Sequence, residues 1–166
     1  PITSFALKGF IWYQGESNVG ANDHYKTLFK RMVDGWNSQW QTWGSGTAQF
    51  IVAQLSSIAC DTGYSGVSPF RQAQREMINT VANTNIIPTY DLGSLMLNAD
   101  NTIDTTSANN SCRPRPSSEI HSVHKVEVGR RFAQAALKNT YQRTGILALA
   151  PELDGNTYAA ANKKFT

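Results

Sequence analysis

Short hydrophobic runs alternate with amphipathic stretches along much of the chain. Three runs, residues 10–13, 50–55 and 86–90, are rich in β-branched and aromatic side chains, which is typical of buried strands. Because the first run contains no charged residue, we expect it to be buried on both faces. Pro88 indicates that the third strand is irregular or lies at a sheet edge.

Three other stretches have the three-and-four spacing of amphipathic helices. Asn22 or Asp23 can cap the first helix, and Ser68 can cap the second, with Pro69 in its first position. The third is expected to run from Lys125 to Lys138. The apolar positions that should face the core are Tyr25, Leu28, Phe29, Met32, Val33, Trp36 and Trp40; Phe70, Ala73, Met77 and Val81; and Val128, Phe132, Ala135 and Ala136.

Alternating strands and helices predict an α/β fold, in which a parallel sheet carries helices on its faces. The length of 166 residues fits one domain of ordinary size. The first strand ends in a polar turn at residues 14–18, and such turns deliver chemistry at the carboxyl edge of an open sheet. Residues 94–118 have almost no periodicity, which is typical of a functional or disordered loop.

Residues 12–18, which read Trp-Tyr-Gln-Gly-Glu-Ser-Asn, resemble a conserved block of the sialate O-acetylesterase family. That family is a branch of the SGNH hydrolases and is related to acetylxylan esterases. Ile120-His121, followed by Lys125 and by residues 128–131, resembles the block around the family's catalytic histidine. Residues 54–57 and 71–74 are weaker matches, and all of them follow one another in family order.

The resemblance implies a three-layer α/β/α SGNH (flavodoxin-like) hydrolase core, of which residues 1–140 form a part. Residues 141–166 then read as a tail that begins a following β-rich segment. The chain begins with Pro1, and we expect it to be a fragment of a longer protein.

Ester hydrolysis by a serine enzyme needs a nucleophile, an imidazole base, an acid that orients the base, and donors for the oxyanion. His121 lies between the long loop and the last helix, whereas His24 and His124 read as helix-surface residues. The resemblance implies that His121 is the base. It also implies that Gly15 and Asn18 supply oxyanion donors, with Gln14 beside them in the substrate site.

Two carboxylates compete for the role of the orienting acid. Some acetylesterases with this block use its glutamate, which is Glu16 here, and we favour this residue. Glu119 is the rival or helper, because it stands two residues before His121, where many relatives have aspartate. Ser122 replaces the proline that follows the histidine in the family, so that the local loop is expected to differ.

The nucleophile is missing from the recognised motifs. The family's serine belongs to a Gly-Gln-Ser-Asn block upstream of the turn, and this chain has no such block. Ser17 is a poor substitute, since residues 15–19 lack the second glycine of a nucleophile elbow. We therefore expect the catalytic serine upstream of this chain, and the chain alone to be inactive.

The expected function is that of a carbohydrate esterase that removes O-acetyl groups from sialic acid without a metal or other cofactor. An O-acetylated glycan or sialic acid is the expected partner. Two alternatives stay open: a non-catalytic carbohydrate-binding or scaffold protein on the same fold, and an acetylxylan esterase. An upstream Gly-Gln-Ser-Asn motif would favour the enzyme over the binding protein.

Composition narrows the remaining classes. The formal net charge is +3 and basic residues gather after Asp104, but no basic stripe alternates with aromatics, so nucleic acid is not an expected partner. No apolar run is long enough to span a membrane. Cys60 and Cys112 lack the clustering of a metal site. They could form a disulfide in a secreted or lysosomal protein, which the sequon at residues 109–111 also favours. The sequence leaves the oligomeric state open.

Overall fold

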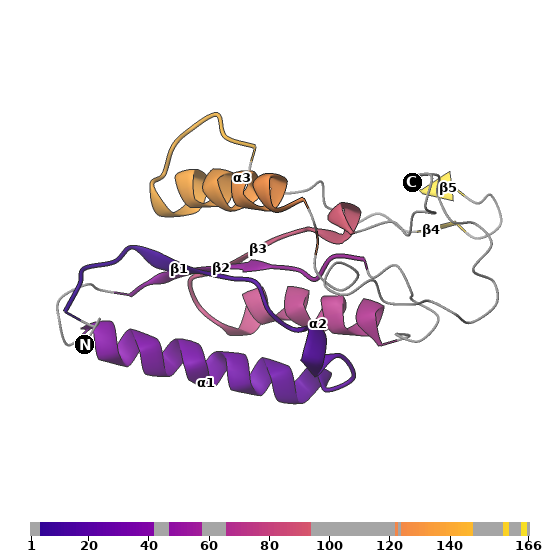
Figure 1. Ribbon diagram of the computed structural model, residues 1–166, viewed down its shortest axis with the longest axis horizontal. Coiled ribbons are helices and arrows are strands. Elements are labelled where there is room, and N and C mark those ends of the chain that lie inside the picture. The colour runs from indigo at the N-terminus through magenta and orange to yellow at the C-terminus, as the bar shows by residue number, and fades with distance from the viewer. Residues whose placement is uncertain are drawn as a thin grey trace, which may run out of the picture.

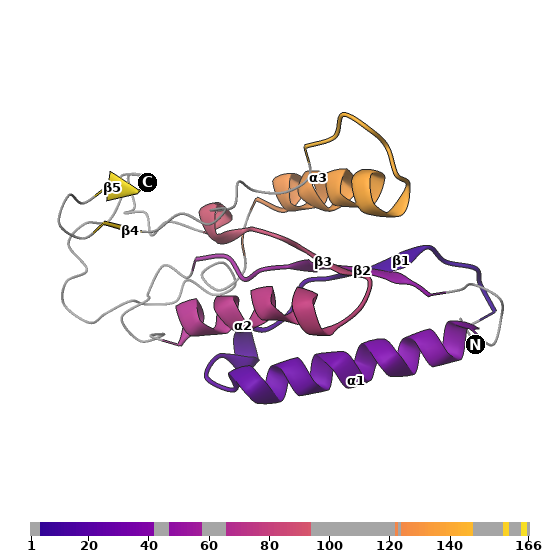
Figure 2. The same cartoon turned by 180° about the vertical axis from the view of Figure 1, so that it is seen from behind.

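The computed structural model describes residues 4–41, 47–57, 66–93, 122, 124–147, 158–159 and 164–165. Its centre is a parallel sheet in the order β1-β2-β3, formed by Gly9–Trp12, Gln49–Ala53 and Thr84–Ile87. Helices α1 (Asn22–Gln41) and α2 (Val67–Thr80) cover one face, and α3 (Lys125–Ala135) covers the other (Figure 1; Figure 2). The predicted three-layer α/β/α fold class is thus confirmed.

Alternate residues of β2 face the two helix layers. Phe50 and Val52 pack with residues of α1 and α2, whereas Ile51 and Ala53 pack with residues of α3. This alternation follows from the pleat, in which successive side chains point to opposite faces. All four side chains are buried. A central strand covered on both sides therefore needs a continuous apolar run, as this sequence has.

Aromatic side chains fill the layer between the sheet and α1. Phe10 and Phe50 are paired across β1 and β2, and their ring centroids lie 4.9 Å apart. Trp36 of α1 contacts both strands, with its ring 4.7 Å from that of Phe10 and 6.1 Å from that of Phe50. The stripe of aromatics on α1 is therefore core packing.

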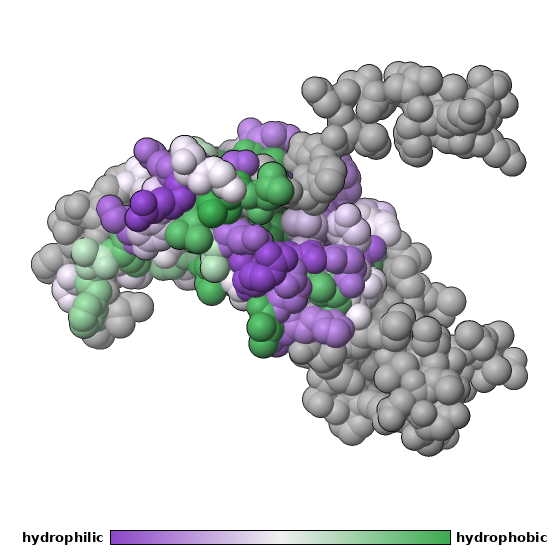
Figure 3. All heavy atoms as spheres, turned by 90° about the horizontal axis from the view of Figure 1, so that it is seen from above, coloured by the Kyte–Doolittle hydropathy of each residue, from purple (hydrophilic) through white to green (hydrophobic). Residues whose placement is uncertain are grey.

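The opposite face of β1 is open. Ile11 is 66% exposed, because α3 packs mainly on β2 and β3 and leaves this strand uncovered on its side. The expectation that residues 10–13 are buried on both faces is therefore wrong for the described part of the chain. Figure 3 views the molecule from the α3 side, where hydrophobic residues reach the surface beside hydrophilic ones.

The helix starts differ from those predicted from capping residues. Tyr25 N donates to Ala21 O at 2.8 Å, so α1 already begins at Asn22 and neither Asn22 nor Asp23 is its cap. Helix α2 begins at Val67 after Gly66, ahead of the predicted cap at Ser68. Pro69 is tolerated in the third helical position because the first turn of a helix has free N–H groups, so its missing N–H costs no bond.

The predicted strands are present with shifted ends. The run at 50–55 corresponds to Gln49–Ala53, and the run at 86–90 to Thr84–Ile87. β3 ends before Pro88, which cannot donate to a ladder. It is an edge strand among the described strands, as expected.

Most of the predicted inward positions face the core, and Leu28, which is 42% exposed, is the clear exception. After Ala135 the last helix continues as a π-helix, Ala136–Thr140. Farther on, β4 (Tyr158–Ala159) and β5 (Lys164–Phe165) form a short antiparallel pair. The division of the chain after residue 140 stays a prediction.

Candidate active site

The segments that follow the three strands meet at one edge of the sheet, because parallel strands have their carboxyl ends on the same side. β1 leads into a 3-10 helix, Glu16–Asn18, and β3 leads into another, Tyr90–Leu92. Residues 54–57 follow β2 between them. The polar turn at 14–18 therefore lies where the sequence predicts a site.

Gly15 gives this turn its shape. Its backbone has φ 151° and ψ −11°, a conformation that residues with a Cβ rarely adopt. A Cβ at this position would also lie 2.6 Å from Cε1 of Phe70 on α2. Asn18 N donates to Gly15 O at 2.8 Å and closes the turn. Glycine is required here by both the dihedral angle and the contact with α2.

Four of the predicted site residues come together in the turn. Gln14 Nε2 donates to Asn18 Oδ1 at 2.8 Å, and Gly15 N donates to Glu16 Oε2 at 3.1 Å. The N–H of Gly15, which is the expected oxyanion donor, is thus hydrogen-bonded to a carboxylate oxygen. Ser17 is exposed within the same 3-10 helix.

Buried side chains of α1 and α2 hold the turn in place through hydrogen bonds. Gln14 O accepts from Tyr25 Oη at 2.9 Å and from Gln74 Nε2 at 3.3 Å, and Trp12 Nε1 donates to Tyr25 Oη at 3.2 Å. Burial raises the pKa of Tyr25. The hydrogen bonds with Trp12 and Gln74 oppose this shift, and the charge of Glu16 adds to it. Tyr25 therefore remains a neutral donor at physiological pH.

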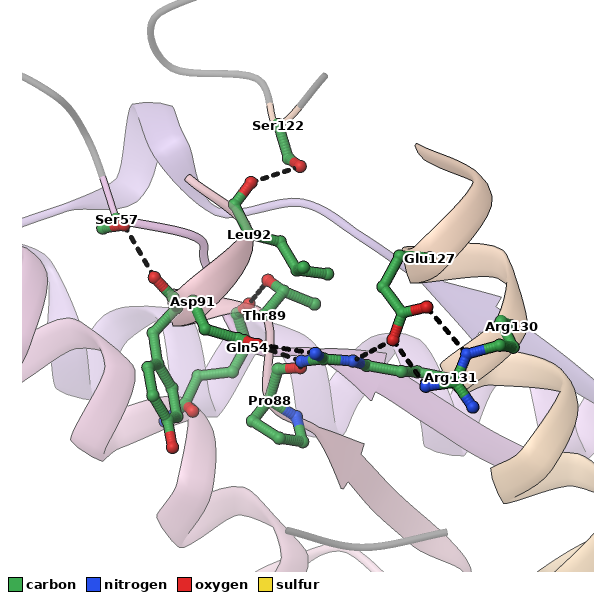
Figure 4. Close-up of polar contacts among 11 residues, drawn as sticks. Gln54, Ser57, Pro88, Thr89, Asp91, Leu92, Ser122, Glu127, Arg130 and Arg131 are labelled. Atoms are coloured by element: carbon green, nitrogen blue, oxygen red, sulfur yellow. Dashed lines mark hydrogen bonds and ion pairs between the residues drawn. The ribbon is translucent and has the colours of Figure 1, made fainter. Parts of the chain in front are cut away.

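The segments after β2 and β3 are tied to each other. Thr89 Oγ1 donates to Gln54 O, and Ser57 Oγ donates to Tyr90 O at 2.6 Å (Figure 4). A Cβ on Gly93 would lie 2.4 Å from the backbone oxygen of Ser57, so the two backbones can approach this closely only with glycine. These contacts hold the segments that follow β2 and β3 together beside the turn.

Arg131 fastens α3 to the same edge. Its guanidinium donates to both carboxylate oxygens of Asp91, at 2.7 and 2.6 Å, and to Pro88 O at 2.7 Å (Figure 4). It also contacts Glu127 at 3.0 Å. Hydrogen bonds from Arg130 and then Arg131 lower the pKa of Glu127 to about 2, and Arg131 lowers the pKa of Asp91. Both carboxylates are therefore ionised at neutral pH.

Ser122, the residue after His121 in the sequence, is 2% exposed and lies at this edge. Its Oγ donates to Leu92 O at 2.5 Å (Figure 4). The same Oγ accepts from His124 N at 3.1 Å. The serine that replaces the family's proline is therefore a tether between the β3 loop and the start of α3. The side chain of His124 is exposed.

The remaining predicted residues lie outside the described residues. They are His121, Glu119, Cys60, Cys112, the loop at 94–118 and the sequon at 109–111. The roles of His121 as base and of Glu119 as rival acid stay predictions, as does the disulfide. His24, read as a surface residue, is exposed on α1.

Other kinds of site were sought in the described ranges. No cluster of His, Cys, Asp and Glu side chains there is placed to hold a metal ion. No helix within those ranges has the length and apolar character needed to cross a membrane. A cavity of about 180 Å³, lined by Ile11, Ile51 and Tyr141 among others, lies at the amino ends of β1 and β2, on the edge opposite the turn.

Sequence reasoning did not assign a role to two residues that build the site. Tyr25 was read as core only, and Gln74 only as part of a weak match. A signal for Gln74 exists, since it stands four residues after Phe70 and three before Met77 and thus on the apolar stripe of α2. A polar side chain on a buried stripe indicates a hydrogen-bonding task.

Comparisons with known proteins agree with the resemblance read from the motifs. No protein-family model matches the chain. The chain is 28% identical to a sialate O-acetylesterase from Rattus norvegicus over 149 residues. This match covers 86% of this chain and 26% of the relative. It is 36% identical over 62 residues to the sialate O-acetylesterases of Homo sapiens and Pongo abelii, or 34% of this chain and 12% of each relative.

The fold has a solved counterpart. A crystal structure of a carbohydrate acetylesterase from Xanthomonas citri matches 96% of this chain with a TM-score of 0.69 and 24% sequence identity, over 32% of its own length. The resemblance to sialate O-acetylesterases and the fold class are confirmed by these similarities. The chain spans about a quarter of the rat relative and an eighth of the other two.

The ion pair between Arg131 and Asp91 predicts an acid-sensitive attachment of α3. A carboxylate with a lowered pKa stabilises the fold above its unfolded pKa, and this contribution is lost as the pH falls through the folded value. For Asp91 the window lies below its ordinary pKa of 3.8, because hydrogen bonds from Arg131 lower that pKa. Glu127, which pairs with Arg130 and Arg131 within α3, adds to the pH dependence between 4.5 and about 2. In Arg131→Met the free energy of unfolding should therefore decrease less as the pH falls through this range. Urea denaturation at several pH values measures this.

Lys30→Met is the matched control for this measurement, because it removes an exposed pair with Asp34 on α1. It should leave the acid slope close to that of the unaltered chain. Equal slopes for Arg131→Met and the unaltered chain would contradict the prediction.

Proposed function

We propose that this chain is part of a carbohydrate esterase that removes O-acetyl groups from sialic acid by Ser-His-acid catalysis. The observation that carries the proposal is the turn at residues 14–18, built by buried contacts at the carboxyl edge of the sheet. The chain that contains this turn is similar to a sialate O-acetylesterase over 149 residues.

Asn18 is the oxyanion donor that the geometry supports best. Its Oδ1 accepts from Gln14 Nε2, and this bond turns the amide so that Nδ2 is left to donate elsewhere. No hydrogen bond of Nδ2 to another described residue competes with a ligand. A preorganised amide N–H at a strand end is the kind of group that stabilises the tetrahedral intermediate of acyl transfer.

The N–H of Gly15 is the second donor in the proposal. Its hydrogen bond to Glu16 Oε2 at 3.1 Å supports the view that this N–H can bind a negatively charged oxygen. The absence of a Cβ lets Phe70 of α2 pack against this glycine, which helps to hold the peptide in place. For this donor to serve the reaction, the carboxylate of Glu16 has to move away when the substrate oxygen arrives.

His121 is the proposed general base, which takes the proton of the serine hydroxyl and returns it to the leaving sugar oxygen. The buried tether from Ser122 to Leu92 supports this assignment, because it fixes the chain one residue after His121 at the carboxyl edge. Glu16, with Glu119 as its rival, is the proposed acid that orients the imidazole.

The serine nucleophile is proposed to lie upstream of this chain, on a strand that pairs with β1. Among the described strands β1 has a partner only in β2, so its outer edge is available. A further parallel strand there would have its carboxyl end next to the turn at 14–18, within reach of both proposed donors. No group from a metal or other cofactor is needed in this scheme.

The base assignment predicts that His121→Ala in the full-length protein abolishes the release of acetate from aryl acetates and from O-acetylated sialic acid, and leaves the fold intact. His124→Ala is the matched control, because its exposed side chain lies three residues along while its backbone N–H keeps the bond to Ser122. Acetate release is measured by steady-state kinetics, and folding by circular dichroism. Near-normal turnover in His121→Ala together with an inactive His124→Ala would contradict the assignment and identify His124 as the base.

The oxyanion assignment predicts that Asn18→Ala lowers kcat by on the order of a hundredfold or more, with a smaller effect on KM. Asn18→Asp is a sharper test, because it keeps an acceptor for Gln14 and replaces the donor with a negatively charged oxygen. It should be at least as impaired as Asn18→Ala. If both variants lose thermal stability but keep kcat, the side chain is a structural cap of the turn.

The missing nucleophile predicts that the 166-residue chain alone releases no acetate and tends to associate, because β1 has an unpaired edge and Ile11 is 66% exposed. A longer form that includes the upstream block should be active and less prone to association in size-exclusion chromatography. A monomeric and active 166-residue chain would contradict this scheme and bring Ser17 back as the candidate nucleophile.

The acetylated sugar is identified by comparing the rates of acetate release by the longer form from acetylated xylan and from O-acetylated sialic acid.

A further inference from the structure

Gln74 is an uncharged polar side chain buried at the candidate site. It is fully buried on α2, between Phe70 and Met77 on the apolar face of the helix. Such a side chain destabilises the fold unless both ends of its amide are hydrogen-bonded. Its position on an otherwise apolar stripe therefore requires partners in the layer that α2 covers.

Both ends of the amide have a backbone partner. Gln74 Oε1 accepts from Leu55 N at 2.9 Å, and Gln74 Nε2 donates to Gln14 O at 3.3 Å. Because an N–H can only donate and a carbonyl can only accept, these partners fix which end of the amide faces which strand. The side chain thus joins the end of β1 to the end of β2.

The bond to Gln14 O acts directly on the proposed oxyanion donor. Gln14 C=O and Gly15 N–H belong to one planar peptide unit, and no described peptide bond is cis. In a trans unit the two groups point in opposite directions. Fixing the carbonyl toward α2 therefore aims the N–H away from α2, to the side where it meets the carboxylate of Glu16.

Two donors converge on this carbonyl, since Tyr25 Oη also contacts Gln14 O, at 2.9 Å. Hydrogen bonds along a chain polarise one another, so donors on a carbonyl make the N–H of the same peptide a stronger donor. The raised pKa of Tyr25 keeps its proton in place for this bond. Orientation and polarisation of Gly15 N–H thus have the same source.

We propose that Gln74 is a positioning residue of this esterase, whose buried amide orients and polarises the Gly15 N–H that receives the oxyanion. The inference rests on the proposed function. It adds a residue on α2 that does not touch the substrate and acts through the peptide between Gln14 and Gly15.

Gln74→Met and Gln74→Glu in the full-length protein test this role. Gln74→Met keeps the apolar volume and removes both bonds, and we expect kcat to fall at least about tenfold with little change in KM, less than the loss expected for a donor itself. Gln74→Glu has the same shape. Its ionised form still accepts from Leu55 N but cannot donate to Gln14 O, whereas its protonated form can do both. The kcat of Gln74→Glu relative to the unaltered enzyme should therefore rise from pH 8 to pH 5.

Gln54→Met is the matched control. Gln54 Nε2 donates to Arg71 O at 3.0 Å, so this amide also joins the end of β2 to α2, but it does not contact the turn. Gln54→Met removes a hydrogen bond between the same two elements and should leave kcat within about twofold, since the donors of the turn are untouched. Equal losses of kcat in Gln54→Met and Gln74→Met, or a Gln74→Glu variant with no gain at acid pH, would overturn the inference.

A structural readout separates this inference from the proposed function. In glycine-labelled protein, the amide proton of Gly15 should shift upfield in Gln74→Met and stay unchanged in Gln54→Met, because a less polarised N–H makes a weaker hydrogen bond. If the unaltered full-length protein hydrolyses no acetyl ester, the proposed function fails and this shift still decides the positioning role. An unmoved Gly15 resonance overturns the inference whatever the activity. Should Gln74→Met not fold, the isosteric Gln74→Glu carries both measurements.

Discussion

Backbone polar groups beyond the strand ends have no ladder partner, and the carboxyl edge of this sheet is built around that constraint. A buried backbone group left without a hydrogen bond costs about 1–3 kcal/mol, a large share of the stability of a small domain. Side chains from neighbouring elements meet the need at this edge: Tyr25 and Gln74 at Gln14 O, Gln74 at Leu55 N, Thr89 at Gln54 O, Arg131 at Pro88 O, and Ser122 at Leu92 O. These hydrogen bonds join the segments after the three strands to the helices and to one another.

The two helix layers are held by different forces. Helices α1 and α2 are attached through a large aromatic and aliphatic cluster, in which Phe50, Phe70 and Met77 are fully buried. Helix α3 covers a smaller cluster and adds the ion pair between Arg131 and Asp91. The layer that carries the turn is thus attached mainly by hydrophobic burial, which pH does not change, while the layer that follows His121 in sequence depends partly on charge.

Hydrophobic periodicity predicted the strands, the helices and the fold class, because burial of apolar faces determines them. The capping residues misplaced the helix starts, since Ser68 and Pro69 are compatible with several positions in a first turn. Periodicity also read Ile11 as buried, because an apolar run does not state which of its faces a helix covers. Local sequence identified the turn at 14–18. It could not identify Gln74, whose task depends on two backbone groups distant in sequence, Gln14 O and Leu55 N.

Glu16 bears on two parts of the proposed catalytic scheme, the acid that orients the base and the oxyanion donor at Gly15 N. Its carboxylate accepts from Gly15 N at 3.1 Å, so in this conformation it occupies the place of an oxyanion. A carboxylate left there would repel the charge that develops on the substrate. If Glu16 orients the base, one movement both supplies the acid and frees the donor. If Glu119 is the acid, Glu16 has to be displaced by the substrate itself, at a cost in binding. The chemistry thus favours Glu16 as the acid, because the same displacement then serves both requirements.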